Sequence, residues 1–412
     1  MSRNLGVILA GGAGTRLFPL TQTRTKPAVP FAGGLRLIDF VLNNFVNSDL
    51  LKIYVLTQFK SQSLNIHLRQ AWYLSGLTGN FIDAIPAQMR MGKRWYEGTA
   101  DAIYQNIRFL QIHEPDNICI FGSDHIYKID VRQVINFHEK CNAALTVCGI
   151  PVPVEEAANR FGVIEVDENF KMVGFEEKPA RPKTIPNQPD KALVSMGNYV
   201  FQSNPLFAYL DQDAEDKLSS HDFGHDIIPK MLSDGLPVYV YDFNTNTIPG
   251  ESESANQGYW RDVGTIYSFW EANMDLLEHE PEFDLYNSKW PLRSYHPPVP
   301  SANIKADEEG NHCTIINSMI ASGSEIVGAH VEKSVLGFKV EVEKNSRLRE
   351  SIILGSCKIG ENCTLNRVIA DKGVRIAPNT QIGIDLELDK SRGLTVSDEG
   401  IVVIPKSMEI GF

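Results

Sequence analysis

Short apolar runs alternate with longer amphipathic stretches over roughly the first 240 residues. Such a run is typical of a strand that is covered on both faces, and strands that alternate with helices are typical of a parallel sheet of βαβ units. The predicted strands are residues 7–10, 52–56, 117–121, 144–148, 198–201 and 237–243. The pattern predicts an α/β domain with a mostly parallel sheet, whose ligands lie at the carboxyl ends of the strands.

The pattern changes after residue 285. Residues 286–302 are rich in proline, which is typical of an extended linker. Beyond them, apolar pairs recur 16 or 17 residues apart, at Met319-Ile320, Val335-Leu336, Ile352-Ile353 and Val368-Ile369. This repeat predicts a β-helix of stacked coils, and an antiparallel β-sandwich is the alternative. We therefore assign residues 1–285 to the α/β domain, 286–305 to a linker and 306–412 to a β-helix domain.

A glycine cluster, Gly-Gly-Ala-Gly-Thr-Arg-Leu, follows the first predicted strand at residues 11–17. Glycine amides can close around a phosphate, and a helix that begins after the loop adds its positive end. The spacing is not that of a dinucleotide loop, because Leu17 stands where the third glycine should be, nor that of a P-loop, which ends in Gly-Lys-Ser/Thr. The glycines alone leave open a tight turn that binds nothing.

The cluster and the following Pro-Leu-Thr and Lys-Pro-Ala-Val-Pro runs, at 19–21 and 26–30, resemble the signature of the sugar-1-phosphate nucleotidylyltransferases. The resemblance implies a Rossmann-like catalytic domain followed by a left-handed parallel β-helix. It also implies that the loop cradles a nucleoside triphosphate, that Arg16 meets the departing pyrophosphate, and that Lys26 meets the phosphates from the other side. The loop residues that take this role are Gly11, Gly12, Gly14 and Thr15.

Two aspartates occupy recognisable settings far apart in the chain. Asp124 stands in Gly-Ser-Asp-His, just past a predicted strand, and Asp262 stands in Trp-Arg-Asp-Val-Gly-Thr. Mg²⁺ is usually held by one or two carboxylates. Either aspartate could instead cap a helix, although Thr265 is better placed to cap the helix predicted at 266–277. The family has its metal-binding aspartates in these settings, so the resemblance implies a shared, catalytic Mg²⁺ on both.

The run Phe-Glu-Glu-Lys-Pro at 175–179 would, in isolation, usually be a solvated face. It resembles the family's sugar-phosphate clasp, in which the glutamate binds sugar hydroxyls and the lysine pairs with the sugar's phosphate. The resemblance gives these roles to Glu177 and Lys178. A compact ammonium suits the second role.

Four short runs resemble the ADP-glucose pyrophosphorylase branch of the family: Pro-Ala-Gln at 86–88, Trp-Tyr-Glu-Gly-Thr-Ala-Asp at 95–101, Phe-Gly-Val at 161–163 and Ser-Met-Gly at 195–197. By this likeness Gln88 and Gly98 contact adenine, whose edge requires a group that both donates and accepts hydrogen bonds. Tyr96, Gly162 and Ser195 line the glucose 1-phosphate pocket.

His221 and His225 are four residues apart, as in a helical zinc pair. Gly224 weakens a helix there and no third ligand is evident. The surrounding Ser-His-Asp-Phe-Gly run also resembles a family segment without a metal role. We therefore predict no zinc site.

Composition narrows the class of protein. A chain of 412 residues with 43% hydrophobic and 22% charged residues is typical of a soluble protein of two domains. The net charge of −12 argues against a general nucleic-acid or anionic-membrane binder, so any phosphate site must be locally basic. The six cysteines form no C-x-x-C pair and are predicted to be reduced, and the absence of a span or signal peptide predicts a cytoplasmic location.

The resemblance covers nearly the whole chain. It implies transfer of AMP from ATP to α-D-glucose 1-phosphate, giving ADP-glucose and pyrophosphate for glycogen-type storage polymers, by a Mg²⁺-dependent homotetramer. A UTP or GTP enzyme of the same family and a non-catalytic regulatory subunit of the same fold are the alternatives. Loss of Arg16, Lys26, Asp124 or Asp262 would have marked a regulatory subunit, and all four are present.

The resemblance also implies regulation by anionic metabolites. Family members activated by fructose 1,6-bisphosphate commonly have lysine and histidine where this chain has Thr23 and Pro30. Residues 26–30 and 52–59 look more like the photosynthetic branch, whose members are regulated by 3-phosphoglycerate and orthophosphate. Lys406 matches an effector lysine of that branch. Arg36 and Lys406 are therefore candidate anion ligands, and the identity of the activator stays open.

Overall fold

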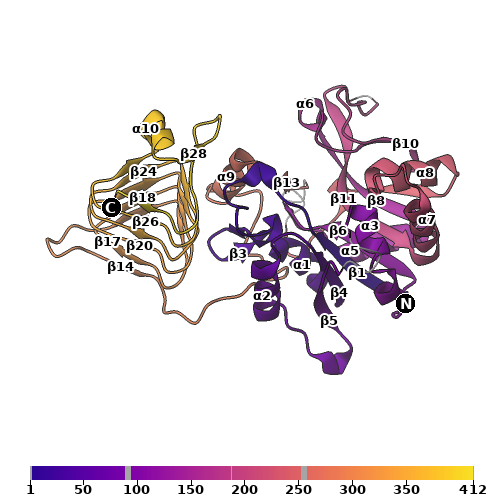
Figure 1. Ribbon diagram of the computed structural model, residues 1–412, viewed down its shortest axis with the longest axis horizontal. Coiled ribbons are helices and arrows are strands. Elements are labelled where there is room, and N and C mark those ends of the chain that lie inside the picture. The colour runs from indigo at the N-terminus through magenta and orange to yellow at the C-terminus, as the bar shows by residue number, and fades with distance from the viewer. Residues whose placement is uncertain (1, 89–93, 187, 252–257, 412) are drawn as a thin grey trace.

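The computed structural model describes residues 2–88, 94–186, 188–251 and 258–411. An α/β part, coloured indigo to salmon in Figure 1, lies beside a β-helix coloured orange to yellow. Helix α9 (Ile266–Asp275) lies at the boundary between them, and an extended stretch of chain without helix or strand leads from it to the β-helix. Within the described residues, no helix is long and apolar enough to cross a bilayer.

A nine-stranded sheet forms the centre of the α/β part. It contains β1 (Asn4–Ala10), β4 (Lys52–Thr57), β5 (Phe81–Pro86), β6 (Asn117–Gly122), β8 (Leu145–Pro153), β9 (Val163–Val166), β10 (Met172–Glu176), β11 (Lys191–Gln202) and β12 (Val238–Asp242). Strands β5, β4, β1 and β6 are parallel neighbours, as the apolar runs predict, and β12 is parallel to β8. The long β11 is antiparallel to β6, β8 and β9, so the sheet is mixed.

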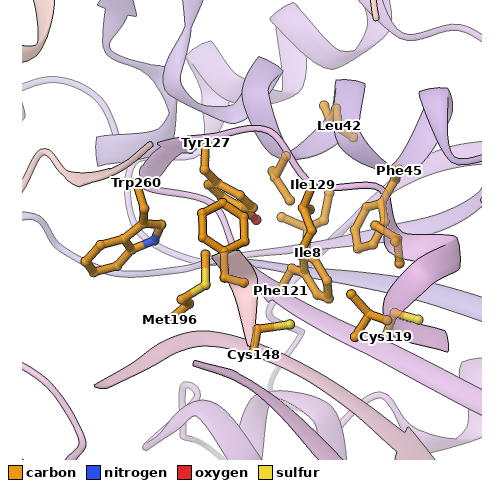
Figure 2. Packing of buried hydrophobic residues seen from close by; sticks show 14 of the residues in the cluster. Ile8, Leu42, Phe45, Cys119, Phe121, Tyr127, Ile129, Cys148, Met196 and Trp260 are labelled. Carbon is orange, nitrogen blue, oxygen red and sulfur yellow. The ribbon is translucent and has the colours of Figure 1, made fainter. Parts of the chain in front are cut away.

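Helices cover both faces of this sheet. They are α1 (Leu37–Asn47), α2 (Gln62–Ala71), α3 (Thr99–Tyr104), α4 (Ile107–Gln111), α5 (Val131–Lys140), α6 (Val154–Ala157), α7 (Ser203–Glu215) and α8 (Ile228–Ser233). Figure 2 shows one of the two core clusters, in which Leu42 and Phe45 of α1 lie close to Ile8 and Phe121 of the parallel strands. These side chains are nearly inaccessible to water, so the carboxyl ends of β1 and β6 are rigidly placed.

Two small antiparallel pairs lie outside the main sheet. Strand β2 (Pro30–Phe31) pairs with β3 (Leu35–Arg36), and β7 (His125–Tyr127) pairs with β13 (Trp260–Asp262). In the second pair Asp262 lies opposite His125. This pairing brings together two segments that are far apart in the sequence.

Three sheets form the β-helix. One contains β14 (Asn303–Lys305), β17 (Glu325–Val327), β20 (Glu341–Val342), β23 (Lys358–Ile359), β26 (Arg375–Ile376) and β30 (Glu409–Ile410). The second contains β15 (Thr314–Ile316), β18 (His330–Glu332), β21 (Arg347–Arg349), β24 (Thr364–Asn366) and β27 (Gln381–Ile382). The third contains β16 (Met319–Ile320), β19 (Val335–Leu336), β22 (Ile352–Ile353), β25 (Val368–Ala370), β29 (Val402–Ile404) and β28 (Thr395–Val396). All of their strand pairs are parallel except β28 with β29, which is antiparallel. A short helix, α10 (Leu386–Ser391), interrupts the last coils.

The predicted apolar pairs stack on one another in the third sheet, with one correction. Met319 lies beside Val335, and Val335 beside Ile352, as the spacing predicts. Ile352, however, lies beside Ile369 and not beside Val368. The coil spacing is therefore 17 residues at this step, and Ile369-Ala370 continues the stack. The first strand, β14, begins at Asn303, within the range that we assign to the linker.

The two parts of the chain share a hydrophobic core. Phe31, Phe40 and Phe269 of the α/β part cluster with Val335 and Ile352 of the β-helix. Polar contacts reinforce the cluster: the indole Nε1 of Trp270 donates to the carbonyl of Glu350 at 2.7 Å. Because this junction is closely packed, the β-helix holds a fixed position beside the catalytic part.

Candidate active site

A cavity of about 750 Å³ opens at the carboxyl ends of β1 and β6. Fourteen of the predicted site residues line it: Gly11, Gly12, Gly14, Thr15, Arg16, Lys26, Tyr96, Gly98, Asp124, Gly162, Glu177, Lys178, Ser195 and Asp262. Gln88 is exposed and is not among the lining residues. Arg36 and Lys406 lie elsewhere, as described below.

The glycine loop lines part of the cavity. The carbonyl of Gly14 accepts a hydrogen bond from the hydroxyl of Thr21 at 2.9 Å, whereas within the described chain the amides of Gly12 and Gly14 donate to no protein group. Gly14 has φ +62°, and a Cβ there would lie 2.9 Å from the Cβ of Lys26. Only glycine therefore fits beside Lys26, and the loop offers its amides to an anion.

Lys26 lies between the two predicted metal-binding carboxylates. Its Nζ is 2.8 Å from Oδ2 of Asp124 and 3.3 Å from Oδ1 of Asp262. Burial acts to lower the pKa of Lys26, but the two carboxylates outweigh burial and raise it above its ordinary value. Burial likewise acts to raise the pKa of Asp124, and the Lys26 ammonium, with a smaller contribution from His125, holds it well below its ordinary value. Lys26 and Asp124 therefore both carry charge at neutral pH.

The β7–β13 pair also brings His125 to the carboxylates. Its Nε2 lies 3.7 Å from Oδ1 of Asp124 and 3.9 Å from Oδ1 of Asp262. One ligand atom from each of the three side chains lies within 4.8 Å of the others, so the group could hold a divalent cation. The capping alternatives are wrong: strand β7, not a helix, follows Asp124, and the Thr265 hydroxyl caps α9 by accepting from the amide of Ser268 at 3.1 Å.

Glu177 and Lys178 lie beside each other in the lining of the cavity. Nζ of Lys178 is 2.7 Å from Oε1 of Glu177, and the Lys178 backbone adopts φ +47°. A Cβ on Gly162 would lie 2.8 Å from Oε2 of Glu177, and one on Gly224 would lie 2.5 Å from it. Two glycines from separate segments therefore make room for this carboxylate, which a solvated face would not require.

The remaining predicted residues are placed by backbone contacts. The Ser195 amide donates to the carbonyl of Gly162 at 2.8 Å, and the Tyr96 amide donates to Oε1 of Gln58 at 2.7 Å. A Cβ on Gly98 would lie 2.1 Å from the carbonyl oxygen of His221. Close approach of that segment, independent of any ligand, thus requires glycine at position 98.

The two histidines of the rejected zinc motif have different surroundings. His221 is buried, with Nδ1 2.7 Å from Oδ2 of Asp213, whereas His225 is exposed, with Nδ1 2.9 Å from Oδ1 of Asp226. The segment packs its backbone against the start of α3, where the Ala100 amide donates to the His221 carbonyl at 2.8 Å.

The cavity-lining residues that sequence reasoning missed include Gln58, His125 and Arg160. His125 directly follows Asp124 and Arg160 directly precedes Phe161-Gly162, so their positions beside recognised motifs were the available signal. Gln58 follows β4, and the rule that ligands lie at the carboxyl ends of parallel strands could have found it.

Comparison with known proteins agrees with this geometry. Residues 5–279 match the family model described as nucleotidyl transferase, and residues 300–404 match that of the GlmU-like C-terminal hexapeptide, as expected for the left-handed β-helix. Glucose-1-phosphate adenylyltransferase 1 of Vibrio cholerae is 61% identical over 412 residues, which is 100% of both chains. The Photobacterium profundum and Thermus thermophilus proteins called glucose-1-phosphate adenylyltransferase are 59% and 48% identical, over 99% and 98% of each chain.

The chain belongs to the glucose-1-phosphate adenylyltransferase family. It is thus a nucleotidyltransferase, as the glycine loop and the two aspartate settings predict.

A second cavity of about 210 Å³ lies between the two parts of this nucleotidyltransferase. Three cationic side chains line it, Arg36, Lys339 and Lys372, and no carboxylate is among its described lining residues. Burial, and then Arg36 and Arg24, lower the pKa of Lys372 to about 8. Lys406 is exposed and does not line the cavity, but its charge also acts to lower the pKa of Lys372.

Proposed function

We propose that the chain transfers AMP from ATP to α-D-glucose 1-phosphate, giving ADP-glucose and pyrophosphate. The observation that carries the proposal is the placement of Lys26 between Asp124 and Asp262, in one cavity that the glycine loop, Glu177 and Lys178 also line. A cation-binding group in one cavity with two candidate phosphate-binding groups suits the joining of two phosphorylated substrates. ADP-glucose would then serve synthesis of a glycogen-type polymer.

The reaction needs no protein nucleophile. One phosphate oxygen of glucose 1-phosphate attacks the α-phosphorus of ATP and forms the new P–O bond. The bond from the α-phosphorus to the oxygen that bridges to the β-phosphorus breaks, and that oxygen leaves with its electron pair on pyrophosphate. Positioning and charge stabilisation supply the catalysis.

The side chains divide these tasks by position. The amides of the glycine loop and Arg16 bind the triphosphate, and Lys26 neutralises charge on the phosphates that face the two aspartates. Lys178 pairs with the phosphate of the sugar, while Glu177 accepts hydrogen bonds from sugar hydroxyls. Gly162, Ser195 and Tyr96 complete the sugar pocket, and Gly98 faces the base, while Gln88, which does not line the cavity, stays a predicted adenine contact.

The donor set at the centre fits Mg²⁺. Two carboxylates meet its preference for oxygen, and their ligand atoms converge with that of His125 within 4.8 Å. Bound Mg²⁺ would bridge phosphate oxygens and offset the charge that develops on them. In this chain Asp124 and Asp262 would hold it, and Lys26 would orient both carboxylates.

Pyrophosphate release tests the proposal. The purified chain is incubated with glucose 1-phosphate, Mg²⁺ and ATP, UTP or GTP in turn. Turnover with ATP alone is expected. Turnover only with UTP or GTP would assign the chain to a sister activity, and no turnover with any nucleotide would favour the regulatory-subunit alternative.

We further propose that the cavity between the two parts binds a phosphorylated effector. Arg36, Lys339 and Lys372 supply positive charge there, and the low pKa of Lys372 reflects its burial first and then the neighbouring cations Arg36 and Arg24. Of the two candidates from the sequence, Arg36 lines the cavity and Lys406 would contribute from outside it. Assay with inorganic phosphate, 3-phosphoglycerate and sugar bisphosphates identifies the effector, and an activity that none of them changes would contradict regulation here.

The homotetramer stays a prediction. The first coil of the β-helix exposes Ile304 and Ile316, with 49% and 44% of their surface accessible, and such apolar side chains suit contact with a second copy. Light scattering after size exclusion measures the assembly, and a monomeric mass would contradict the prediction.

A further inference from the structure

Arg160 lies in the main cavity at a point that no motif marks. It belongs to the loop between α6 and β9, and 37% of its side chain is exposed. Its guanidinium lies over the ring of Phe161, with 5.0 Å from Cζ to the ring centroid. The Phe161 ring packs edge-on against Trp260, at 5.1 Å between centroids, and Trp260 begins the strand that carries Asp262. This aromatic stack fixes the guanidinium relative to the aspartate.

The guanidinium keeps most of its hydrogen-bonding capacity. Its Nη2 lies 3.5 Å from Oδ2 of Asp262, and within the described residues the guanidinium makes no hydrogen bond to the protein. A guanidinium has five N–H donors in a planar fork that matches the oxygens of a phosphate. Arg160 therefore presents unused donors to the cavity. The neighbouring carboxylate of Asp262 is already neutralised by Lys26, whose Nζ lies 3.3 Å from its other oxygen, Oδ1.

The backbone next to Arg160 is attached to the residues assigned to the sugar phosphate. The carbonyl of Phe161 accepts from the Lys178 amide at 3.1 Å, and that of Gly162 accepts from the Ser195 amide at 2.8 Å. The loop is thus attached to the residues assigned to the sugar phosphate, while its guanidinium reaches Asp262.

We propose that Arg160 is a catalytic residue that donates hydrogen bonds to the phosphate of glucose 1-phosphate, together with Lys178. It would lower the repulsion between this dianion and the triphosphate as the new P–O bond forms. The inference rests on the proposed function, because it names a further ligand of the same acceptor substrate. The competing explanation is that Arg160 only balances the charge of Asp262.

Steady-state kinetics of Arg160→Gln and Arg160→Lys separate the two explanations. We expect Arg160→Gln to raise the KM for glucose 1-phosphate about 10- to 100-fold while changing the KM for ATP about twofold or less. Arg160→Lys should recover part of the loss, since it keeps the charge but not the fork. The matched control is Arg349→Gln, which removes an exposed β-helix arginine whose Nε is 3.7 Å from Oε1 of Glu350. An unchanged KM for glucose 1-phosphate with an increased Mg²⁺ requirement would overturn the proposal.

Calorimetric binding of glucose 1-phosphate separates this inference from the proposed function. The titration uses the wild-type and Arg160→Gln chains with Mg²⁺ and α,β-methylene-ATP, which cannot release pyrophosphate. Affinity that falls about tenfold or more in the variant supports the role of Arg160, even if the wild-type chain shows no turnover. Equal affinity in both chains would refute the role while leaving adenylyl transfer intact, and no binding to the wild-type chain would refute both.

Discussion

The two cavities both gather cationic side chains, but they differ in what lies opposite the cations. In the main cavity Lys26 contacts Asp124 and Asp262, and Lys178 contacts Glu177. In the cavity between the two parts, Arg36, Lys339 and Lys372 line a space without a described carboxylate. A balanced arrangement suits a site that takes both a cation and phosphates, whereas an unbalanced one favours an anion alone.

The difference appears in the pKa values. The pKa of Lys26 is raised because its carboxylate partners outweigh its burial. The pKa of Lys372 is lowered to about 8 by burial and by the neighbouring arginines. The protein therefore stabilises the charged form of Lys26. It destabilises the charged form of Lys372, which a bound anion would stabilise. Four substitutions or conditions test this comparison.

The largest effect is expected at the balanced site. Asp124→Asn should reduce pyrophosphate release about 10³-fold or more, since it removes a carboxylate that would hold the cation and orient Lys26. Circular dichroism should show an intact fold. Asp83→Asn, which changes an exposed aspartate of β5, is the control, and an active, folded Asp124→Asn chain would exclude Asp124 from the metal site.

The second effect concerns Asp371, the carboxylate next in sequence to Lys372 of the unbalanced cavity. Asp371 accepts from Nη2 of Arg24 at 2.9 and 3.0 Å, and both side chains are buried. Asp371→Asn would leave the Arg24 charge uncompensated, so we expect a loss of about 3–5 kcal/mol in the free energy of unfolding. It should also tighten binding of inorganic phosphate, because the neighbouring cations lose their counter-charge. Denaturant unfolding and calorimetry measure the two changes, and an unaltered phosphate affinity would separate Asp371 from the cavity.

The sequence predicted the two cavities unequally. The glycine loop, Lys26 and the two aspartates lie within continuous motifs, so their residue types and spacing were sufficient. Arg36 and Lys372 come from different parts of the chain and meet only when the β-helix packs on the α/β part. No local pattern could signal that meeting: the sequence named Arg36, which lines the cavity, and Lys406, which lies outside it, but neither Lys339 nor Lys372.

The fold shows the same limit. The apolar runs predicted the parallel strands, because buried strands need continuous apolar sequence, but they did not indicate that the long β11 runs antiparallel. The repeat predicted stacked coils, yet Val368 is buried as well as Ile369, so hydrophobicity alone could not choose the register. Arg160 is a further case: its contact with Asp262 brings the loop after α6 to β13, where Phe161 packs against Trp260, and these segments are distant in the sequence.

The third effect is a gain of stability at Lys372. The pKa of Lys372 is about 8 in the folded chain and about 10.5 ordinarily, so its charged form lowers the free energy of unfolding. This destabilisation is absent above about pH 10.5 and is fully present below about pH 8. Lys372→Met should therefore stabilise the chain at pH 7 by roughly 3 kcal/mol without an anion. Inorganic phosphate should raise the melting temperature of the wild-type chain more than that of the variant. Lys358→Met, which removes an exposed lysine paired with Glu341, is the control.

The smallest effect is the pH dependence of the anion response. Because Lys372 loses its charge as the pH rises through about 8, phosphate affinity should fall between pH 7 and pH 9 by at most about tenfold. Bound phosphate favours the charged lysine, so the midpoint in the complex should lie above that of the free protein. Calorimetric titration with phosphate at pH 7, 8 and 9 measures this fall in affinity. In Lys372→Met the affinity should change with pH only as far as the ionisation of phosphate itself changes it. An equal decline in both chains would show that Lys372 does not face the anion, and the contrast between the cavities would then rest on Arg36 and Lys339.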